Sequence, residues 1–267
     1  VCGIDLAGTV VESLSNNFSV GDRVLVNGFG LSERHWGGYS ELQRVNPDFL
    51  VKIPESFSSL QAMAIGTAGY TAMLAVNAIR DKNISPESGI VLVTGAAGGV
   101  GSVGIMLLSK LGYQVAASTG RASLADYLRE LGATEILGRD EFARKAKPLE
   151  KENWAACIDS VGSTTLATVL AQTRYDGLVA ACGLAGGTDL PATVIPFLLR
   201  NVTLQGIDSV MAPMSARERA WRDLATILDK EALEKAISVV PLDKTIEIAG
   251  EILEGKIRGR TVIDVNA

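Results

Sequence analysis

The hydrophobic positions of this 267-residue chain change their period once along the sequence. Up to about residue 53, short apolar runs alternate with glycine-rich turns, a pattern that predicts short strands in a small β-barrel-like module. From about residue 84, short apolar runs alternate with helix-length segments, which is typical of a parallel, doubly wound sheet with right-handed crossovers. We therefore predict an α/β protein with a second, smaller β-module.

The same pattern predicts the individual elements and the domain bounds. In the first region we expect strands at 4–11, 23–26 and 49–54, with another short strand after 36–41. The parallel sheet is expected to contain strands 90–94, 113–118, 135–138, 155–160, 177–182 and 202–207, with helices 99–111, 123–131, 164–172 and 194–199. The tail should hold helices 216–228 and 243–255 and a strand, 260–265, that returns to the first module. The predicted domains are 1–60 with 240–267, and 61–239.

A long uncharged stretch covers residues 56–79. It contains polar residues and a Gly66-Thr67-Ala68-Gly69 interruption, whereas a membrane helix of about 20 residues would be more uniformly apolar. We predict a buried helix with Ser59 as its N-cap.

Residues 89–101 predict a cradle for a dinucleotide. A buried strand at 90–94 is followed by a glycine-rich turn and by a helix that begins near Gly99. Glycines let the backbone approach a pyrophosphate closely, and the helix N-terminus presents free N–H groups to it. Ala97 replaces the second glycine of G-x-G-x-x-G, but the strand–turn–helix context favours a nucleotide site over an ordinary tight turn.

The end of the next strand predicts which cofactor binds. NAD usually meets an acidic residue here, about 20 positions after the glycines, which bonds the ribose. This chain has Ser118-Thr119-Gly120-Arg121 instead. A guanidinium pairs with phosphate oxygens in a charge-assisted fork. We therefore predict NADPH, with a solvated helix-start arginine as the alternative role for Arg121.

Composition narrows the classes of partner and compartment. Apolar residues make up 47% of the chain and the net charge is −5, with no cluster of Lys and Arg, so we expect no nucleic-acid or membrane partner. The three cysteines, Cys2, Cys157 and Cys182, are widely spaced, which indicates a reducing, cytoplasmic compartment without a disulfide frame. The first residues already resemble the middle of a sheet, so we expect an N-terminal portion to precede Val1.

Several segments resemble the medium-chain dehydrogenase/reductase superfamily. Residues 3–10 are similar to its G-H-E-x-x-G-x-V strand, 20–24 to its G-D-x-V turn, and 38–41 to its G-G-Y-A-E segment. A narrower resemblance is to the zinc-free, quinone-oxidoreductase-like branch that contains NADPH-dependent acrylyl-CoA reductases. The segments that carry it are 33–38, 65–73, 180–187 and 198–210. It implies a Rossmann domain plus a GroES-like module that looks truncated at its N-terminus, because the family's Asn-Tyr-Lys-Asp segment has no counterpart here.

The resemblance also implies roles for individual residues. The pyrophosphate would meet Ala97, Gly98, Gly99 and Val100. The 2′-phosphate would meet Ser118, Thr119, Gly120 and Arg121, with Arg139 near the adenosine. Leu184, Leu198 and Ser209 would line the nicotinamide side, and Asn266 would touch the cofactor. Thr67 is a possible catalytic residue. Core packing is the alternative for the two leucines. Asp159 and Asp208 are candidate acids, for which capping is the expected role.

No metal is expected. A catalytic zinc takes three protein ligands, but the superfamily's zinc-histidine position holds Ile4, and His35 is the sole histidine. We interpret His35 as a structural loop residue rather than as a residue near the substrate.

The activity that the resemblance implies is NADPH-dependent, zinc-independent reduction of the C=C bond of a short α,β-unsaturated acyl thioester such as acrylyl-CoA. A quinone or enone reductase and a non-catalytic NADPH-binding sensor remain as alternatives. Arg34, Arg258 and Arg260 are candidate contacts for coenzyme A. We expect a homodimer paired through the strand at 202–207.

Overall fold

The computed structural model describes residues 1–267 and separates them into two compact units. Unit 1 comprises Val1–Tyr70 and Asp208–Ala267, and unit 2 comprises Thr71–Ile207. These limits differ from the predicted 1–60, 61–239 and 240–267. The first boundary falls inside a single helix, α1 (Ser59–Asp81), and the second follows directly after the strand Thr203–Gly206. The functional domain bounds stay a prediction.

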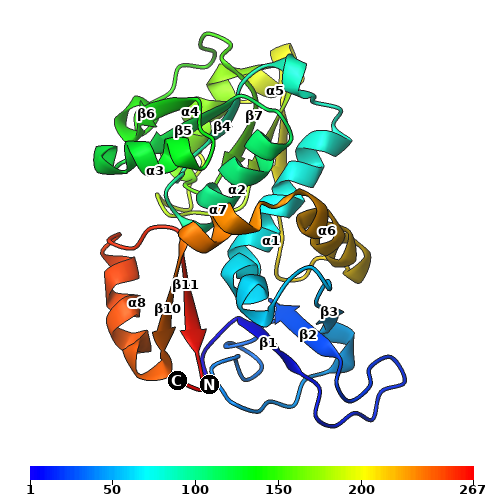
Figure 1. The fold of residues 1–267 in the computed structure, drawn as a ribbon. Helices are drawn as coiled ribbons and strands as arrows, with labels where there is room; N and C mark the ends of the chain where they lie inside the picture. Colours follow the sequence, from blue (N-terminus) through cyan, green and yellow to red (C-terminus); the bar gives the residue numbers. More distant parts are fainter. The chain divides into compact units, whose positions relative to one another are not determined.

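Unit 2 contains a six-stranded parallel sheet in the order β6-β5-β4-β7-β8-β9, so the predicted doubly wound fold is confirmed (Figure 1). The central strands are buried on both faces, as parallel strands covered by helices must be. The strands are β4 (Val91–Val93), β5 (Val115–Thr119), β6 (Glu135–Gly138), β7 (Trp154–Asp159), β8 (Thr173–Ala181) and β9 (Thr203–Gly206). The helices are α2 (Gly99–Lys110), α3 (Ala125–Glu130), α4 (Ser163–Gln172) and α5 (Ile195–Arg200).

The core of unit 2 joins the sheet to α4. Leu92, Cys157 and Val179 from three strands pack with Val169 and Leu170 of the helix, and all five side chains are fully buried. Burying each large aliphatic side chain contributes about 1.5–3 kcal/mol. The crossover from β6 to β7 has no α-helix, only a short 3-10 turn, Arg139–Glu141, and a loop.

Unit 1 contains two small sheets rather than the single module expected from the sequence. An antiparallel sheet is formed by β1 (Asp5–Thr9), β2 (Arg23–Asn27) and β3 (Val51–Lys52). The C-terminal part holds α6 (Met214–Ile227), α7 (Lys230–Lys235), β10 (Ile237–Pro241), α8 (Thr245–Leu253) and β11 (Arg260–Asp264).

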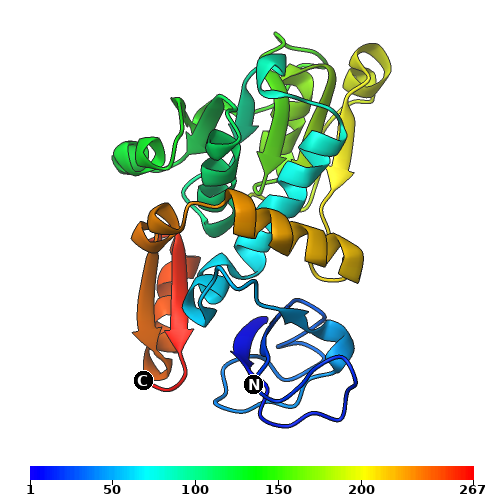
Figure 2. The same cartoon turned by 45° about the vertical axis from the view of Figure 1, so that its right-hand side comes forward.

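Two predictions about unit 1 were wrong. The last strand does not return to the first sheet, because β10, which was not predicted, pairs with it in parallel through α8 (Figures 1 and 2). No strand follows 36–41 either. Gly37 and Gly38 instead lie against the backbone of Cys2 and Asp5, where an added Cβ would overlap main-chain atoms.

Helix α1 contains the long uncharged stretch and is buried as predicted. By length and composition it would be able to cross a membrane, but 78% of its most apolar window is buried inside the protein. Its cap is Ser58, not Ser59, because the Ser58 hydroxyl accepts the Gln61 N–H and the Gln61 side chain accepts the Ser58 N–H. At Gly66 the backbone leaves the helical region (φ 50°, ψ −163°), so α1 consists of two helical segments.

Candidate functional site

The glycine-rich turn after β4 forms the cradle predicted for the pyrophosphate. Gly95 has a φ of 59°, and a Cβ on Gly101 would lie 2.5 Å from the Gly95 carbonyl oxygen, so both positions favour glycine. The Ser102 N–H donates to the Gly98 carbonyl at 2.9 Å. The amides of Gly99, Val100 and Gly101 precede that bond and can bind an anion. The predicted residues 97–100 therefore lie together at this turn.

Two arginines lie at the ends of the strands next to this turn. The Arg121 guanidinium is 3.5 Å from the Ala97 carbonyl oxygen, and the Arg121 N–H donates to the Thr119 hydroxyl at 3.1 Å. The Arg139 guanidinium covers the backbone of Gly120, where an added Cβ would overlap it. The predicted residues 118–121 and Arg139 are thus brought to one place. Their two positive charges suit a phosphate group.

Asp159 fixes the base of the turn rather than acting as an acid. It is fully buried, accepts the Thr94 hydroxyl at 2.6 Å and accepts the Gly162 N–H at 2.8 Å. The Ser160 hydroxyl donates to the Thr94 carbonyl at 3.0 Å. Burial raises the pKa of Asp159, and these hydrogen bonds oppose the rise. These contacts hold β4 and β7 together where the glycine turn leaves the sheet, as the expected structural role requires.

Leu184 and Leu198 are not core residues. Leu184, in the loop after β8, is 64% exposed, and Leu198, on α5, is 75% exposed. Core packing, the alternative considered for both, is therefore wrong.

Thr67 begins the second segment of α1 and is held by Asp5. The Asp5 carboxylate accepts the Thr67 N–H at 3.0 Å and the Thr67 hydroxyl at 2.6 Å, and it also accepts the Asn27 side-chain amide at 2.7 Å. It therefore caps a helix N-terminus from another element. Because the Thr67 hydroxyl donates to Asp5, this arrangement does not offer its proton to a substrate.

Arg260 lies beside the Asp5 carboxylate at the Gly66 kink. A Cβ on Gly66 would meet both the Arg260 guanidinium and Asp5, and the Arg260 Nε donates to the Ala64 carbonyl at 2.9 Å. Burial lowers the pKa of Arg260, and the Asp5 and Tyr39 charges oppose this. Asp5 and the Ala64 carbonyl hold the guanidinium at this kink, and its contact with coenzyme A stays a prediction.

Ser209 and Asn266 also belong to unit 1. Ser209 follows Asp208, whose carboxylate accepts the amides of Val210 and Met211 at 2.8 and 3.0 Å, so this aspartate stabilises a turn and has a structural role. Asn266 is exposed after β11, and its N–H donates to Asp264 at 3.0 Å.

The side chains do not fit a zinc ion. His35 packs against the Phe49 ring with centroids 5.3 Å apart, and Asp5 is bound to Thr67 and Asn27. No three His, Cys, Asp or Glu side chains converge as a metal site in residues 1–267. Since a catalytic zinc takes three protein ligands, we derive no step through a metal.

Sequence reasoning missed Asp5, Tyr70 and Arg217. Arg217 is 1% exposed, and Tyr70 has a buried hydroxyl without a hydrogen-bond partner. One signal was available for Arg217: it shares an i, i+3, i+4, i+7 face of α6 with Ala220, Trp221 and Leu224, all buried. The contacts of Asp5 and Tyr70 join segments far apart in sequence and leave no local pattern.

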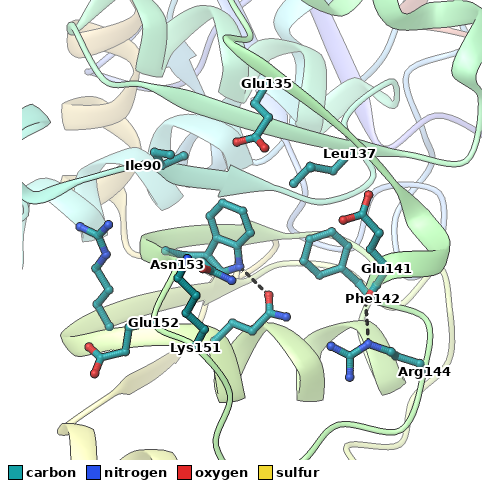
Figure 3. A pocket seen from close by; sticks show the side chains of 12 residues that line it. Ile90, Glu135, Leu137, Glu141, Phe142, Arg144, Lys151, Glu152 and Asn153 are labelled. Carbon is teal, nitrogen blue, oxygen red and sulfur yellow. Dashed lines mark hydrogen bonds between the residues drawn. The ribbon is translucent and has the colours of Figure 1, made fainter.

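A cavity of about 620 Å³ lies in unit 2 (Figure 3). Ile90 and Asn153, which line it, immediately precede β4 and β7, whereas the glycine turn follows the other end of β4. Its floor includes Phe142 and Trp154, whose indole N–H donates to Gln172 at 2.9 Å. The cavity is therefore distinct from the candidate cofactor site.

Comparison with known proteins agrees with this geometry. The zinc-binding dehydrogenase family matches residues 99–227. The acrylyl-CoA reductase AcuI of Ruegeria pomeroyi is 54% identical over 100% of this chain and 81% of that protein. The yhdH oxidoreductase of Salmonella enterica, solved in complex with NADP, superposes with a TM-score of 0.97 at 52% identity, covering 98% of this chain and 81% of that one. The Bacillus subtilis protein yhfP, solved with NAD bound, gives 0.96 at 42% identity, covering 99% and 81%.

The parallel sheet, the glycine turn and the arginine pair define a dinucleotide-dependent oxidoreductase of the doubly wound α/β class. The chain belongs to the medium-chain dehydrogenase/reductase family, in the branch of the acrylyl-CoA reductases and their quinone-oxidoreductase-like relatives.

Proposed function

We propose that this protein reduces the C=C bond of a short α,β-unsaturated acyl thioester, such as acrylyl-CoA, with NADPH. The observation that carries the cofactor assignment is Arg121 beside the Ala97 carbonyl, with Arg139 on Gly120. An acidic residue, which NAD sites place near the ribose, is absent from 118–121. The thioester is supported by the similarity along the whole chain to an acrylyl-CoA reductase.

The proposed roles follow the geometry of each unit. In unit 2, the amides of 99–101 bind the pyrophosphate and Arg121 binds the 2′-phosphate, with Arg139 beside it. Leu184 and Leu198 offer exposed apolar surface for the nicotinamide side. In unit 1, we assign Thr67, Ser209 and Asn266 to the cofactor as well. Thr67 serves as a positioning residue, because its hydroxyl donates to Asp5.

The chemistry needs no metal from the protein. NADPH supplies the hydride, which adds to the β-carbon of the unsaturated thioester. Negative charge then develops on the thioester oxygen, and preorganised hydrogen-bond donors stabilise it. A proton reaches the α-carbon from a side chain or water.

The decisive experiment follows NADPH oxidation by the purified protein with acrylyl-CoA and with a benzoquinone at matched concentrations, and repeats both with NADH. We expect acrylyl-CoA with NADPH to give the highest kcat/KM. Equal use of NADH would overturn the 2′-phosphate assignment, and the absence of turnover with both acceptors would overturn the enzymatic proposal in favour of an NADPH sensor.

A quinone or enone reductase is the second candidate. It is favoured by one finding, the 43% identity with a Bacillus subtilis protein named a putative quinone oxidoreductase. Faster turnover of the benzoquinone in the same experiment would select it.

We further propose a cytoplasmic homodimer that acts on a small molecule and binds neither membrane nor nucleic acid. Support comes from three unpaired cysteines, a net charge of −5 and a sheet that ends in an open edge strand, β9. Cell fractionation tests the location, and light scattering tests the oligomeric state.

A further inference from the structure

A fully buried arginine organises the segment that carries Ser209. Arg217, on α6, is 1% exposed. Its guanidinium donates to four main-chain carbonyls from two segments of the chain. They belong to Asn27, at 2.5 Å, and to Ser209, Val210 and Ala212, at 3.1, 2.6 and 2.9 Å. It therefore ties the end of β2 to residues 209–212.

This guanidinium is bound by carbonyls and aromatic rings rather than by a carboxylate. Its central carbon lies 3.9 Å from the centroid of the Phe29 ring and 5.3 Å from that of Tyr70. Phe29 also stacks on Phe49, with ring centroids 4.5 Å apart, so the guanidinium belongs to a cluster of aromatic rings. A planar cation with five donors suits this place, whereas the ammonium of lysine is a point charge that cannot form the same fork.

The backbone on both sides is built for this close approach. Gly28 has a φ of 76°, and a Cβ there would lie 2.8 Å from the Val210 Cα. The Phe29 N–H donates to the Val210 carbonyl at 3.0 Å. From the other side, Asp208 accepts the amides of Val210 and Met211. Residues 208–212 are thus held on both sides of Ser209.

We propose that Arg217 is a positioning residue for hydride transfer: it fixes residues 208–212 so that Ser209 is presented to the nicotinamide end of the cofactor. The inference rests on the proposed role of Ser209. The proposal gives the two arginines different effects. Loss of Arg217 should slow hydride transfer at the nicotinamide end of the cofactor, whereas loss of Arg121 should weaken binding at the phosphate end.

The test is Arg217→Lys in the full chain, with Arg200→Lys as the matched control. Arg200 also donates to main-chain carbonyls, those of Glu150, Ala171 and Thr173. These carbonyls lie in unit 2, where β7 and β8 begin, at the end of the sheet opposite the glycine turn. Both variants lose hydrogen bonds to main-chain carbonyls and should lower Tm. We expect only Arg217→Lys to lower kcat, on the order of 10- to 100-fold. It should also raise the deuterium isotope effect with 4-deuterated NADPH, while NADPH affinity changes less than about threefold.

Two outcomes would overturn the proposal: a Tm loss in Arg217→Lys with unchanged kcat and isotope effect, or an equal kcat loss in Arg200→Lys. If Arg217→Lys does not fold, Phe29→Leu is the second variant, because it removes one ring beside the guanidinium and leaves all of its donors. This variant should also lower kcat and raise the isotope effect, by smaller amounts than Arg217→Lys. Wild-type values of both would overturn the proposal.

The isotope effect is measured with whichever acceptor the wild-type protein reduces. The test of Arg217 therefore does not depend on whether acrylyl-CoA is that acceptor. If no acceptor is reduced, the emission yield of bound NADPH reports the nicotinamide surroundings. A change in Arg217→Lys but not in Arg200→Lys supports the placement of 208–212, and identical yields overturn it.

Discussion

In the proposed cofactor site, Arg121 is the residue that we expect to distinguish NADPH from NADH. Replacing it with alanine removes charge-assisted hydrogen bonds to the 2′-phosphate, which contribute about 1.5–3 kcal/mol. We expect Arg121→Ala to raise the KM for NADPH about 10- to 100-fold and to leave the KM for NADH unchanged. Initial rates with both cofactors measure this. Arg129→Ala, which removes an exposed arginine paired with Asp126 on α3, is the control and should change neither KM. Parallel losses with both cofactors in Arg121→Ala would contradict the assignment.

Single residues differ in how far the sequence reveals them. Arg121 was visible because its place follows from counting along one strand and one turn, which are local features. The helix face of Arg217 indicates its burial, but its Asn27 partner lies about 190 positions away and the Thr67 partner of Asp5 about 60, so the sequence does not reveal these contacts. The place of Arg260 was equally hidden, because the Gly66 kink beside which its guanidinium lies leaves no pattern near residue 260 in the sequence.

At the scale of elements, the β4–α2 turn depends on close backbone contact. In Gly101→Ala the new Cβ would lie 2.5 Å from the Gly95 oxygen and 2.6 Å from the Ala96 Cα, and main-chain atoms cannot move aside without opening the turn. We expect a loss of about 1–3 kcal/mol in the free energy of unfolding and at least about tenfold weaker NADPH binding.

The matched control on the same helix is Gly104→Ala. Its Cβ would make ordinary contact with Ile158 at 3.4 Å, so the variant should be neutral or up to about 1 kcal/mol more stable, because alanine favours a helix. Chemical denaturation and NADPH titration of both variants measure this. Equal behaviour of the two would show that the turn tolerates a side chain.

The crossover loop between β6 and β7 is stabilised by an ion pair instead of a helix. Glu150 accepts hydrogen bonds from Arg144, Gln172 and the Lys147 N–H, and the Arg144 contact, the largest cause, lowers the pKa of Glu150 to about 2. A carboxyl group whose pKa is lower in the folded state than in the unfolded state stabilises the folded protein at pH values above the unfolded pKa, here 4.5. This contribution to the free energy of unfolding disappears as the pH falls toward 2.

We therefore expect Glu150→Gln to lower the free energy of unfolding by about 1 kcal/mol at pH 7, since the pair is partly exposed. The difference from wild type should shrink as the pH falls below 4.5. Urea titrations at several pH values measure this, with Glu130→Gln, at the exposed end of α3, as the control. A difference that does not depend on pH would contradict the role of the charge.

At the scale of the whole chain, the sequence predicted the large sheet better than the small ones. The central strands of unit 2 are buried on both faces and leave strong apolar runs. The edge strand β6, although only partly buried, was also predicted with its observed bounds. In the C-terminal region, β10 has no fully buried residue and gave no comparable signal. Without β10, the last strand was assigned to the wrong sheet, because strand pairing is a non-local choice.

The open edge of the large sheet leads to the last prediction, the oligomeric state. β9 has a partner on one side only, β8, so its other side presents unpaired backbone groups. The neighbouring α5 exposes Leu199. Two copies pairing β9 about a two-fold axis would cover both features. Light scattering at micromolar concentration should therefore give a mass of about twice 28.1 kDa.

The change that should break this dimer is Gln205→Lys, because it places a charge on the exposed edge of β9 in both copies, and edge lysines oppose strand pairing. The expected mass is then that of one chain, 28.1 kDa, at the same concentration. Glu135→Lys makes a similar change on β6, at the opposite edge of the sheet, and should leave the dimer intact. A monomeric wild type would refute the dimer, while dissociation by Glu135→Lys but not by Gln205→Lys would move the interface to the β6 edge.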